Sequence, residues 1–261
     1  IYDQQAQHTN QNRELAEAES MRRDFSSNVS HEMKTPLQVI SGYAELMKND
    51  MVLPEDRQKF AGLIYDEAQA MRGLINDVLT LSKLDESAFA REERPIDVTS
   101  VARRMAGRLE SFAADEGVSI SVKGASAHIN GSETLAEEML YNLIENAVRY
   151  NHAGGSVSVR VSQGAASEEV LEALRAAGAE PDPASVVTVR VSDTGAGIPE
   201  EMREKVFERF FRLDKSRSKE TGGTGLGLAI VKHAVQYHHG TICVEGAQGE
   251  GATFVLRLPA A

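Results

Sequence analysis

The first 90 residues carry apolar side chains at helical spacing on both sides of one short turn. Residues 1 to about 48 contain no proline or glycine before Pro36 and Gly42, and they predict one long helix. Residues 49–55 predict a turn, with Pro54 near the start of a second helix that reaches about residue 90. Two long helices joined by so short a turn form an antiparallel hairpin, which restricts this part of the chain to an all-α fold.

Each helix of this hairpin has an apolar stripe that is too wide for one partner helix. On the first helix the stripe fills a sector of about 120°, and it consists of Phe25, Val29, Met33, Leu37, Ile40, Ala44 and Met47. A homodimer that forms a four-helix bundle would bury both stripes, so we expect a dimer. The alternative is an inert coiled-coil spacer. His31 falls nearly opposite the centre of the stripe, with Thr35 one turn later, so both are expected to face solvent.

After Arg94-Pro95 the pattern changes to mixed helix and strand. Helices are predicted over 99–115, 134–150 and about 225–238, and strands over 118–122, 156–162, 186–192, 241–246 and 252–258. The second helix is expected to begin with a capping box formed by Thr134 and Glu137. These elements indicate an α+β sandwich of antiparallel or mixed strands with helices on one face. Residues 163–184 are an insertion with its own helix, 167–177, expected to pack on the outside or contact a partner.

The composition excludes several classes of function. A formal charge of -11 argues against nucleic-acid binding and against contact with a membrane surface. The single cysteine, Cys243, rules out an internal disulfide, fits a reducing compartment and is expected to be buried in a strand. No stretch approaches the roughly 18 apolar residues that cross a bilayer, and no signal peptide is visible. The chain begins at Ile1 instead of Met, so we expect a fragment of a longer protein.

One face of the helix over 134–150 carries side chains suited to a nucleotide. Asn142 and Asn146 lie one turn apart and offer neutral oxygen ligands to Mg²⁺, which leaves the metal's charge for phosphates. Arg149 is placed to contact phosphate, and Tyr150 is placed to stack on a base. An ordinary solvent-facing helix would show a similar polar face.

Two glycine-rich segments add to this chemistry. Asp193 ends a strand and can accept a hydrogen bond from an amine such as adenine N6, while Gly195 and Gly197 let the backbone approach a ring. The amides of 222–228 precede a helix directly and form an anion site. That segment lacks both the ending of a Walker A loop and the leading strand of a Rossmann motif. Between them, Pro199–Thr221 has the charged and aromatic composition of a mobile lid, or of a surface loop.

In this order the motifs resemble those of bacterial sensor histidine kinases of two-component systems, in the branch that senses phosphate or the cell wall. The resemblance covers residues 20–258. Its segments are a phosphoacceptor box at 30–37, an asparagine box at 142–147, glycine boxes at 193–197 and 223–228, a phenylalanine box at 207–211 and a closing glycine segment at 249–254.

The resemblance implies a signalling helix (1–24), a dimerisation and phosphotransfer hairpin (25–92) and a Bergerat-type ATP-binding domain (93–261). It implies that His31 attacks the γ-phosphate of ATP with Nε2 while Glu32 takes the proton from the Nδ1 side. The phosphoryl group would then pass to an aspartate of a response regulator's receiver domain. Thr35 would orient a water molecule for the reverse, phosphatase reaction.

The resemblance also implies a set of binding residues for ATP and Mg²⁺. The metal would be held by Asn146 and Asn142. The nucleotide would contact these two residues and Arg149, Tyr150, Asp193, Gly195, Gly197, Ile198, Phe207, Lys215, Arg217, Gly223, Thr224, Gly225, Leu226, Gly227, Leu228 and Thr253. Arg149 is a departure, because many members of the family have lysine there.

The expected setting is cytoplasmic, as the intracellular part of a membrane-anchored receptor. Two other functions share some of these features. One is an ATPase of the same nucleotide fold, of the chaperone or DNA-repair type, against which the hairpin with His31 and Glu32 argues. The other is a dimeric scaffold that has lost catalysis, against which the complete asparagine and glycine motifs argue. His233, His238 and His239 are expected to be surface residues at a helix end, not metal ligands.

Overall fold

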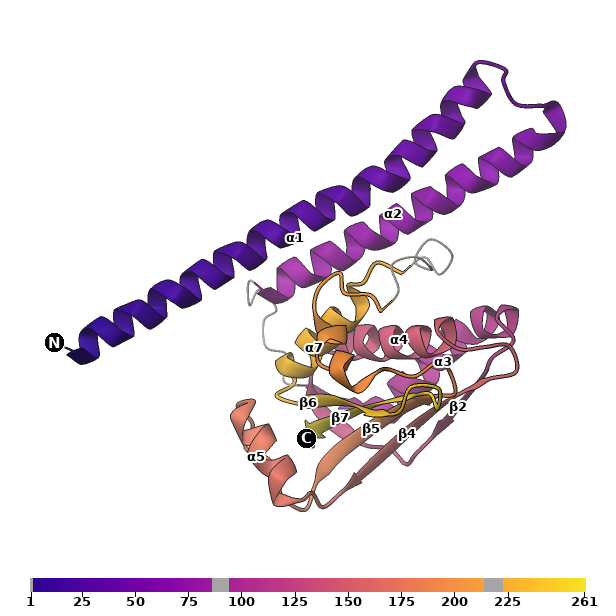
Figure 1. Cartoon of the computed structure of the whole chain (residues 1–261). Helices are drawn as coiled ribbons and strands as arrows, with labels where there is room; N and C mark the ends of the chain where they lie inside the picture. The colour runs from indigo at the N-terminus through magenta and orange to yellow at the C-terminus, as the bar shows by residue number, and fades with distance from the viewer. Residues whose placement is uncertain (1, 86–93, 214–222) are drawn as a thin grey trace. The chain divides into compact units, whose positions relative to one another are not determined.

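The computed structural model describes residues 2–85, 94–213 and 223–261 (Figure 1). They divide into two compact units, Ile1–Val78 and Leu79–Ala261. In the described helices no segment is both long enough and apolar enough to span a membrane.

The first unit is formed by the predicted helical hairpin, and the last residues of its second helix, from Leu79, are counted with the second unit. The hairpin consists of α1 (Tyr2–Lys48), a short 3-10 helix η1 (Pro54–Asp56) and α2 (Arg57–Asp85). The turn between the helices is held by an ion pair of Arg57 with Asp50 at 2.8 Å. Beside it, the rings of Tyr43 and Phe60 meet edge to face, with centroids 5.1 Å apart. The pairing of the two helices at this end supports the predicted hairpin.

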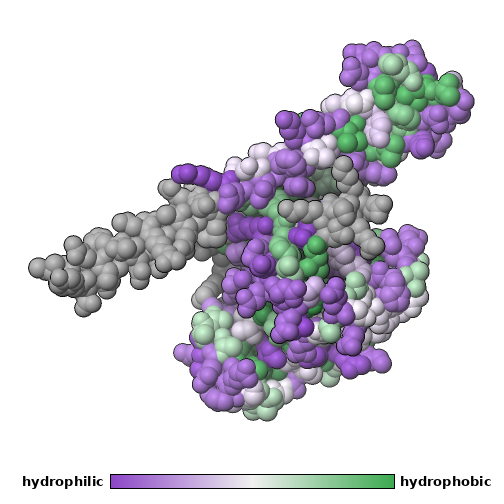
Figure 2. All heavy atoms as spheres, viewed as in Figure 1, coloured by the Kyte–Doolittle hydropathy of each residue, from purple (hydrophilic) through white to green (hydrophobic). Residues whose placement is uncertain are grey.

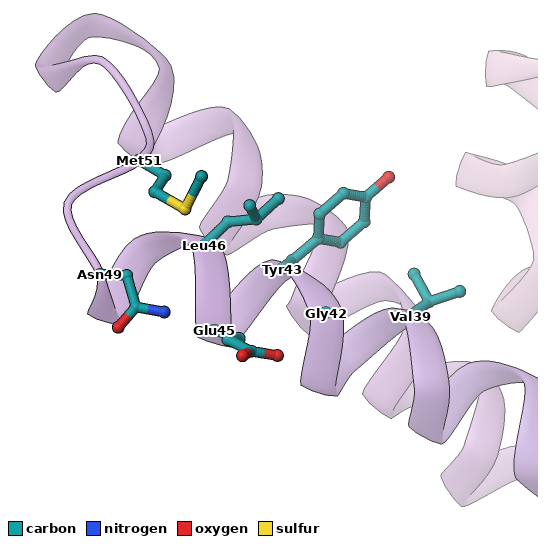
Figure 3. A pocket seen from close by; sticks show the side chains of 7 residues that line it. All are labelled: Val39, Gly42, Tyr43, Glu45, Leu46, Asn49 and Met51. Atoms are coloured by element: carbon teal, nitrogen blue, oxygen red, sulfur yellow. The ribbon is translucent and has the colours of Figure 1, made fainter.

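Apolar side chains remain exposed on this hairpin. Leu37 is 51% exposed, Tyr65 62% and Met51 71%. Figure 2 shows hydrophobic residues gathered at the tip of the hairpin. An open hollow there is lined by Val39, Gly42, Tyr43, Glu45, Leu46, Asn49 and Met51 (Figure 3). Since it lies on the apolar surface and far along α1 from His31, this hollow belongs to the unpartnered face of the hairpin and not to a catalytic site.

The second unit is a five-stranded mixed sheet with helices packed on one face. The strand order is β2 (Ser119–Lys123), β4 (Ser156–Gly164), β5 (Val186–Asp193), β7 (Ala252–Pro259) and β6 (Thr241–Gly246). β2 and β4 run parallel, and the other neighbours are antiparallel. The helices α3 (Val98–Asp115), α4 (Glu133–Arg149) and α7 (Gly227–Tyr237) share the core with one face of this sheet (Figure 1). The predicted sandwich is confirmed.

Alternation along the strands explains which face is covered. Val157, Val159 and Val161 on β4 are buried, as are Val187, Val189 and Val191 on β5. They pack against apolar residues of the helices in one continuous core. The residues between them point to the opposite face, which is largely polar.

A second, two-stranded sheet was not predicted. β1 (Arg94–Asp97) pairs antiparallel with β3 (His128–Gly131), and the pair joins the start of α3 to the start of α4. Asp97 caps α3 by accepting hydrogen bonds from the N–H groups of Thr99 and Ser100. Burial raises the pKa of its carboxyl, but hydrogen bonds from the side chains of Ser100 and Ser126 and from the N–H groups of Ser100 and Ala127 lower that pKa to about 2.

Three expectations for single residues were wrong. α4 starts at Glu133 with Ser132 as its N-cap, so Thr134 forms no capping box, and Glu137 is bound instead by Arg104 from α3, Nε to Oε1 at 3.0 Å. Cys243 lies in a strand as predicted but is half-buried, because its side chain is on the polar face of the sheet. His238 is buried, not a surface residue.

Both nitrogens of the His238 ring are used. Its Nδ1–H donates to the carbonyl of Ala234 at 2.7 Å, and Nε2 accepts the N–H of Ser132 at 3.3 Å. These bonds require the neutral ring with its proton on Nδ1. Burial lowers the pKa of His238, and the hydrogen bond that Nδ1–H donates to the carbonyl of Ala234 opposes that shift. The ring therefore ties the end of α7 to the start of α4 in its neutral form.

The insertion after β4 contains α5 (Glu168–Ala176), close to the predicted helix. Leu171, Leu174 and Ala179 form a small core of their own on Val186 of β5. The His239 ring donates from Nδ1 to the carbonyl of Ala177 at 3.0 Å. As expected, the insertion packs on the outside of the sandwich.

Candidate functional site

His31 lies on α1 with its side chain 80% exposed, as predicted. Its Nδ1 is 3.8 Å from Oε1 of Glu32, and Nε2 makes no hydrogen bond within the described residues. The Thr35 hydroxyl is exposed on the same side and donates to the carbonyl of His31 at 3.4 Å. Pro36 follows inside the helix and has no N–H to give to the carbonyl of Glu32, one turn earlier. This leaves an accessible imidazole nitrogen beside a carboxylate, in a helix weakened at that turn.

In the second unit, Asn142 and Asn146 take different positions on α4. Asn142 is only 9% exposed. Its Nδ2 donates to the carbonyl of Glu138 at 2.8 Å, and its Oδ1 faces Gly227, where a Cβ atom would lie only 2.5 Å away. Asn146 is half-buried and makes no side-chain hydrogen bond within the described residues. The side-chain oxygen of Asn146 therefore has no partner among the described residues, whereas Asn142 joins α4 to the first residue of α7.

Asp193 is held by backbone groups from two segments. Its Oδ1 accepts the N–H of Gly195 at 2.8 Å and that of Ala252 at 3.2 Å. Burial raises the pKa of Asp193, and these two bonds oppose the rise. Oδ2 receives no hydrogen bond from the described part of the chain. The carboxylate is therefore fixed in orientation with one oxygen left to accept a donor such as an amino group.

The glycines of the first motif allow close packing around Asp193. A Cβ on Gly195 would collide with the carbonyl of Tyr150, and Gly197, at φ +69°, lies against the carbonyl of Ala247. The Gly249 N–H donates to the carbonyl of Ala196 at 2.7 Å. The first glycine box and the closing glycine segment are thereby one packed unit.

The second glycine segment approaches the same place. Gly223 faces the hydroxyl of Tyr150, to which a Cβ would come within 3.4 Å. Thr224 accepts the N–H of Leu226 on its hydroxyl at 3.2 Å, and α7 begins at Gly227. The residue pairs Asn142–Gly227, Tyr150–Gly195 and Tyr150–Gly223 thus join the asparagine helix to both glycine segments.

Several of the predicted nucleotide contacts also pack or pair with residues of the same domain. Phe207 is 9% exposed and meets Phe254 edge to face at 6.2 Å, Leu226 is fully buried, and Ile198 and Leu228 pack on the core. Thr253 donates from its hydroxyl to that of Ser192 at 2.9 Å. Arg149 pairs with Glu145 at 2.7 Å, and its guanidinium lies 5.4 Å from the ring centre of Phe112 on α3. Lys215 and Arg217 lie outside the described residues.

Comparison with known families matches both units. The model for the histidine kinase-, DNA gyrase B- and HSP90-like ATPases matches residues 131–261, and that for the His Kinase A (phospho-acceptor) domain matches residues 21–87. The chain belongs to this ATPase family. With the phospho-acceptor domain before it, the chain has the two domains of a sensor histidine kinase's catalytic portion.

Curated relatives of this chain are sensor proteins. The sensor-like histidine kinase SenX3 of Mycobacterium tuberculosis is 35% identical over 248 residues, covering 95% of this chain and 56% of the relative. The phosphate regulon sensor protein PhoR of Pseudomonas aeruginosa is 33% identical over 245 residues, covering 92% of this chain and 50% of the relative. The chain therefore spans about half the length of these relatives.

Solved histidine kinases have a similar fold. Full-length ShkA in complex with AMPPNP matches with a TM-score of 0.61 and 28% identity, over 90% of this chain and 45% of that one. The Acinetobacter baumannii histidine kinase AdeS matches with a TM-score of 0.65 at 21% identity, over 88% of this chain and 97% of that one. At that identity the second match supports the fold alone.

The sequence motifs did not indicate how the described part of the segment predicted as a lid is anchored. Phe210 adopts φ 62° and donates its N–H to the carbonyl of Gly225 at 2.8 Å, and Arg209 contacts His233 Nε2 at 3.3 Å. Gly225 was the only signal, since a glycine at φ +70° permits the close approach of Phe210.

Proposed function

We propose that this chain phosphorylates itself on His31 from ATP and passes the phosphoryl group to an aspartate of a response regulator. The observation that carries the proposal is the exposed imidazole, with Nδ1 beside Glu32 and with an Nε2 that no described residue binds. A neutral imidazole protonated on Nδ1 presents the Nε2 lone pair to the γ-phosphorus. The Nε2–P bond forms, the bond from phosphorus to the β,γ-bridging oxygen breaks, and ADP leaves. Glu32 accepts the Nδ1 proton, so the phosphohistidine does not remain cationic.

The second unit supports ATP as the phosphoryl donor. Asp193 has one oxygen oriented for the adenine amino group, and Tyr150 lies between the two glycine segments with its ring half exposed. The amides that lead into α7 suit phosphates, since the N-terminus of a helix attracts anions. Related ShkA was solved with AMPPNP, an ATP analogue. The other nucleotide contacts that the sequence motifs predict, from Gly197 in the first glycine box to Thr253 in the closing glycine segment, are proposed because they belong to the same set of motifs.

Mg²⁺ fits the donor set through Asn146. The described residues contain no cluster of three or more His, Cys, Asp or Glu side chains that could hold a metal. A neutral amide oxygen together with phosphate oxygens suits Mg²⁺, which keeps several waters and needs few protein ligands. Mg²⁺ bound there would neutralise charge on the phosphates. Asn142 is proposed as the second ligand only if it leaves its hydrogen bond to Glu138.

We infer the partners and domain limits from the same features. The exposed apolar side chains of the hairpin support a homodimer. Residues 1–24 are proposed as a signalling helix, 25–92 as the dimerisation and phosphotransfer hairpin, and 93–261 as the ATP-binding domain. Nucleic acid and membrane are not proposed partners of this segment. A cytoplasmic position, in a receptor anchored to a membrane elsewhere in its chain, is proposed from the sensor relatives.

Incubation with γ-labelled ATP and Mg²⁺ tests the proposal. The chain is expected to acquire a label that survives alkali and is lost in acid, and His31→Gln is expected to abolish it while AMPPNP binding persists. An acid-stable label, or a label that persists in His31→Gln, would contradict the assignment. Binding and hydrolysis of ATP without any protein label would favour an ATPase of the same fold.

A second activity, dephosphorylation of the regulator, is proposed from Thr35, whose hydroxyl is exposed one turn after His31. A hydroxyl in that position can orient a water molecule toward the phosphorylated partner. Thr35→Ala is expected to slow dephosphorylation of the regulator at least tenfold and to leave autophosphorylation within about twofold. Equal phosphatase rates for Thr35→Ala and the unmodified chain would remove Thr35 from this role.

A further inference from the structure

The face of the sheet opposite the core carries cations in one row across three strands. Lys123 on β2 is opposite Arg160 on β4, and Arg160 is opposite Arg190 on β5. Like charges in directly opposed positions destabilise a sheet. Only Arg190 has an acidic partner among the described residues, Glu245 at 2.5 Å. The row is therefore unfavourable for the isolated domain and stands out in a chain of net charge -11.

The rest of this face adds to the positive charge. Arg257 on β7 is on the same side and contacts the sulfur of Cys243 at 3.6 Å, without an acidic partner in the described part of the chain. Hydroxyl residues occupy the neighbouring row, in which Ser121, Ser158, Ser192 and Thr253 lie side by side. We call Lys123, Arg160 and Arg190 the cation row of the sheet, and Arg257 lies beside it, level with Thr188 and not with Arg190.

The insertion places acids on the same side of the sandwich. α5 is anchored on Val186, which shares the polar face with Arg190 because the two are four residues apart on one strand. Glu169, Glu172 and Glu180 are exposed and make no ion pair within the described residues, whereas Glu168 pairs with Arg175 at 2.6 Å. Glu169 and Glu172 lie away from the helix face that buries Leu171 and Leu174. We call Glu169, Glu172 and Glu180 the acidic group of the insertion.

The two charged groups do not meet within one chain. Along β5 the distance from Val186 to Arg190 is about 13 Å, and His239 and the small core fix α5 at the Val186 end. A surface with a positive and a negative region side by side is complementary to itself after a two-fold rotation. Each region of one copy then faces the opposite region of the other, as in isologous interfaces.

We propose that the cation row and the acidic group form a salt-sensitive contact between the catalytic units of two copies of this chain. The row spans two strand spacings, about 10 Å, which is too wide for one small anion. Proteins that bind nucleic acid neutralise more phosphates, about six to ten in typical cases, and the neighbouring acids would repel them. A second copy of this chain supplies acids opposite the cation row and cations opposite the acidic group. Such a contact also gives the insertion a role, whereas the nucleotide site does not use the insertion.

Zero-length cross-linking of the complete chain tests this contact. A carbodiimide joins Lys123 to a carboxylate only where the two touch, and a bond between copies gives a two-chain band on a denaturing gel. The expected band contains Lys123 joined to Glu169 or Glu172 on peptide mapping. The band is expected to be strong at low salt and weak at about 0.5 M salt. That is roughly three times physiological ionic strength, and it screens charges over a shorter distance. A Lys123–insertion link found only in single chains would overturn the proposal.

Charge reversal separates a second copy from any other acidic partner. Arg160→Glu, alone or with Arg257→Glu, and separately Glu169→Lys with Glu180→Lys, leave the reporter pair Lys123 and Glu172 intact. Each set is expected to lower the Lys123–Glu172 link about fivefold, and combining both sets is expected to restore it. A matched control, Glu110→Lys with Glu116→Lys on exposed acids near α3, is expected to leave it unchanged. Loss that the combination does not restore, or no effect of the acidic set, would overturn the proposal.

Discussion

Replacing Gly227 by alanine measures how tightly the asparagine helix and α7 are packed. A Cβ there would lie 2.5 Å from Asn142 Oδ1, about 0.9 Å closer than an ordinary contact allows. Asn142 cannot simply rotate away, because it is 9% exposed and its Nδ2 donates to the carbonyl of Glu138 at 2.8 Å. Either Asn142 breaks that bond, or the start of α7 moves away from α4 and takes the second glycine segment with it.

The cost follows from these two routes. Overpacking of a well-packed interior costs about 1–3 kcal/mol, and the lost hydrogen bond of Asn142 contributes about 0.5–1.5 kcal/mol of that when the side chain yields. If the strain is relieved by displacing the start of α7, the free energy of nucleotide binding is weakened by the same amount. We therefore expect the Kd for AMPPNP with Mg²⁺ to rise about 5- to 150-fold.

Titration calorimetry with AMPPNP measures this change, and Gly107→Ala is the matched control. Gly107 is in α3, and a Cβ there would meet nothing within 4 Å. Alanine stabilises a helix over glycine by about 0.5–1 kcal/mol, so this control should melt about 1–4 °C higher and bind nucleotide unchanged. Adding Asn142→Ser to Gly227→Ala removes the colliding amide and should recover part of the affinity.

Gly227→Ala with both an unchanged Kd and an unchanged melting temperature would refute the close packing of α4 on α7. The double variant tests whether Asn142 is a ligand of Mg²⁺ and nucleotide. If Gly227→Ala with Asn142→Ser binds no better than Gly227→Ala alone, Asn142 acts as a ligand of the nucleotide complex and not as a contact between helices.

Three further predictions concern single polar residues. Asp193→Asn should weaken AMPPNP binding about 10- to 100-fold, because an amide cannot accept hydrogen bonds both from the two backbone N–H groups and from the adenine amine. Burial raises the pKa of Asp193, so replacing its charge should also raise the melting temperature of the nucleotide-free chain at pH 7. A lower melting temperature would contradict this. Burial lowers the pKa of His238, so the unfolded chain binds more protons and stability should fall as pH drops below about 6.5; melting curves of His238→Gln should lack that part of the pH dependence. Asp97→Ala should lower the free energy of unfolding by about 1–2 kcal/mol at neutral pH. Because the pKa of Asp97 is lowered to about 2, this loss of stability relative to the unmodified chain should shrink as pH falls from about 4 toward 2. A loss of stability that does not depend on pH would contradict the role of Asp97 as a cap.

Periodic segments were predictable because their side chains repeat with the period of the element. The two hairpin helices, α3, α4 and the valine strands β4 and β5 all fall within a few residues of expectation. β1 and β3 escaped prediction because each has four residues and its partner is more than 30 residues away, so neither shows alternation. Such short strands are specified by pairing and not by local sequence.

Local motifs failed where a distant residue competed for the same group. Glu137 had the spacing of a capping box with Thr134, but Arg104, 33 residues earlier, takes its carboxylate. His238 had the composition of a surface helix end, but Ser132, more than 100 residues earlier, donates to its ring. Sequence spacing along one element does not contain these contacts.

The glycines of the candidate site also make contacts with residues that are distant in sequence. Gly195 lies against the carbonyl of Tyr150, Gly251 against that of Asp193 and Gly227 against the amide of Asn142. Each contact joins segments that are distant in sequence, and each would be broken by a single methyl group. Loss of activity on substituting one of these glycines therefore does not by itself establish that its amide binds phosphate. A variant that loses nucleotide binding but keeps its melting temperature would report a ligand contact, whereas parallel loss of both would report packing within the site.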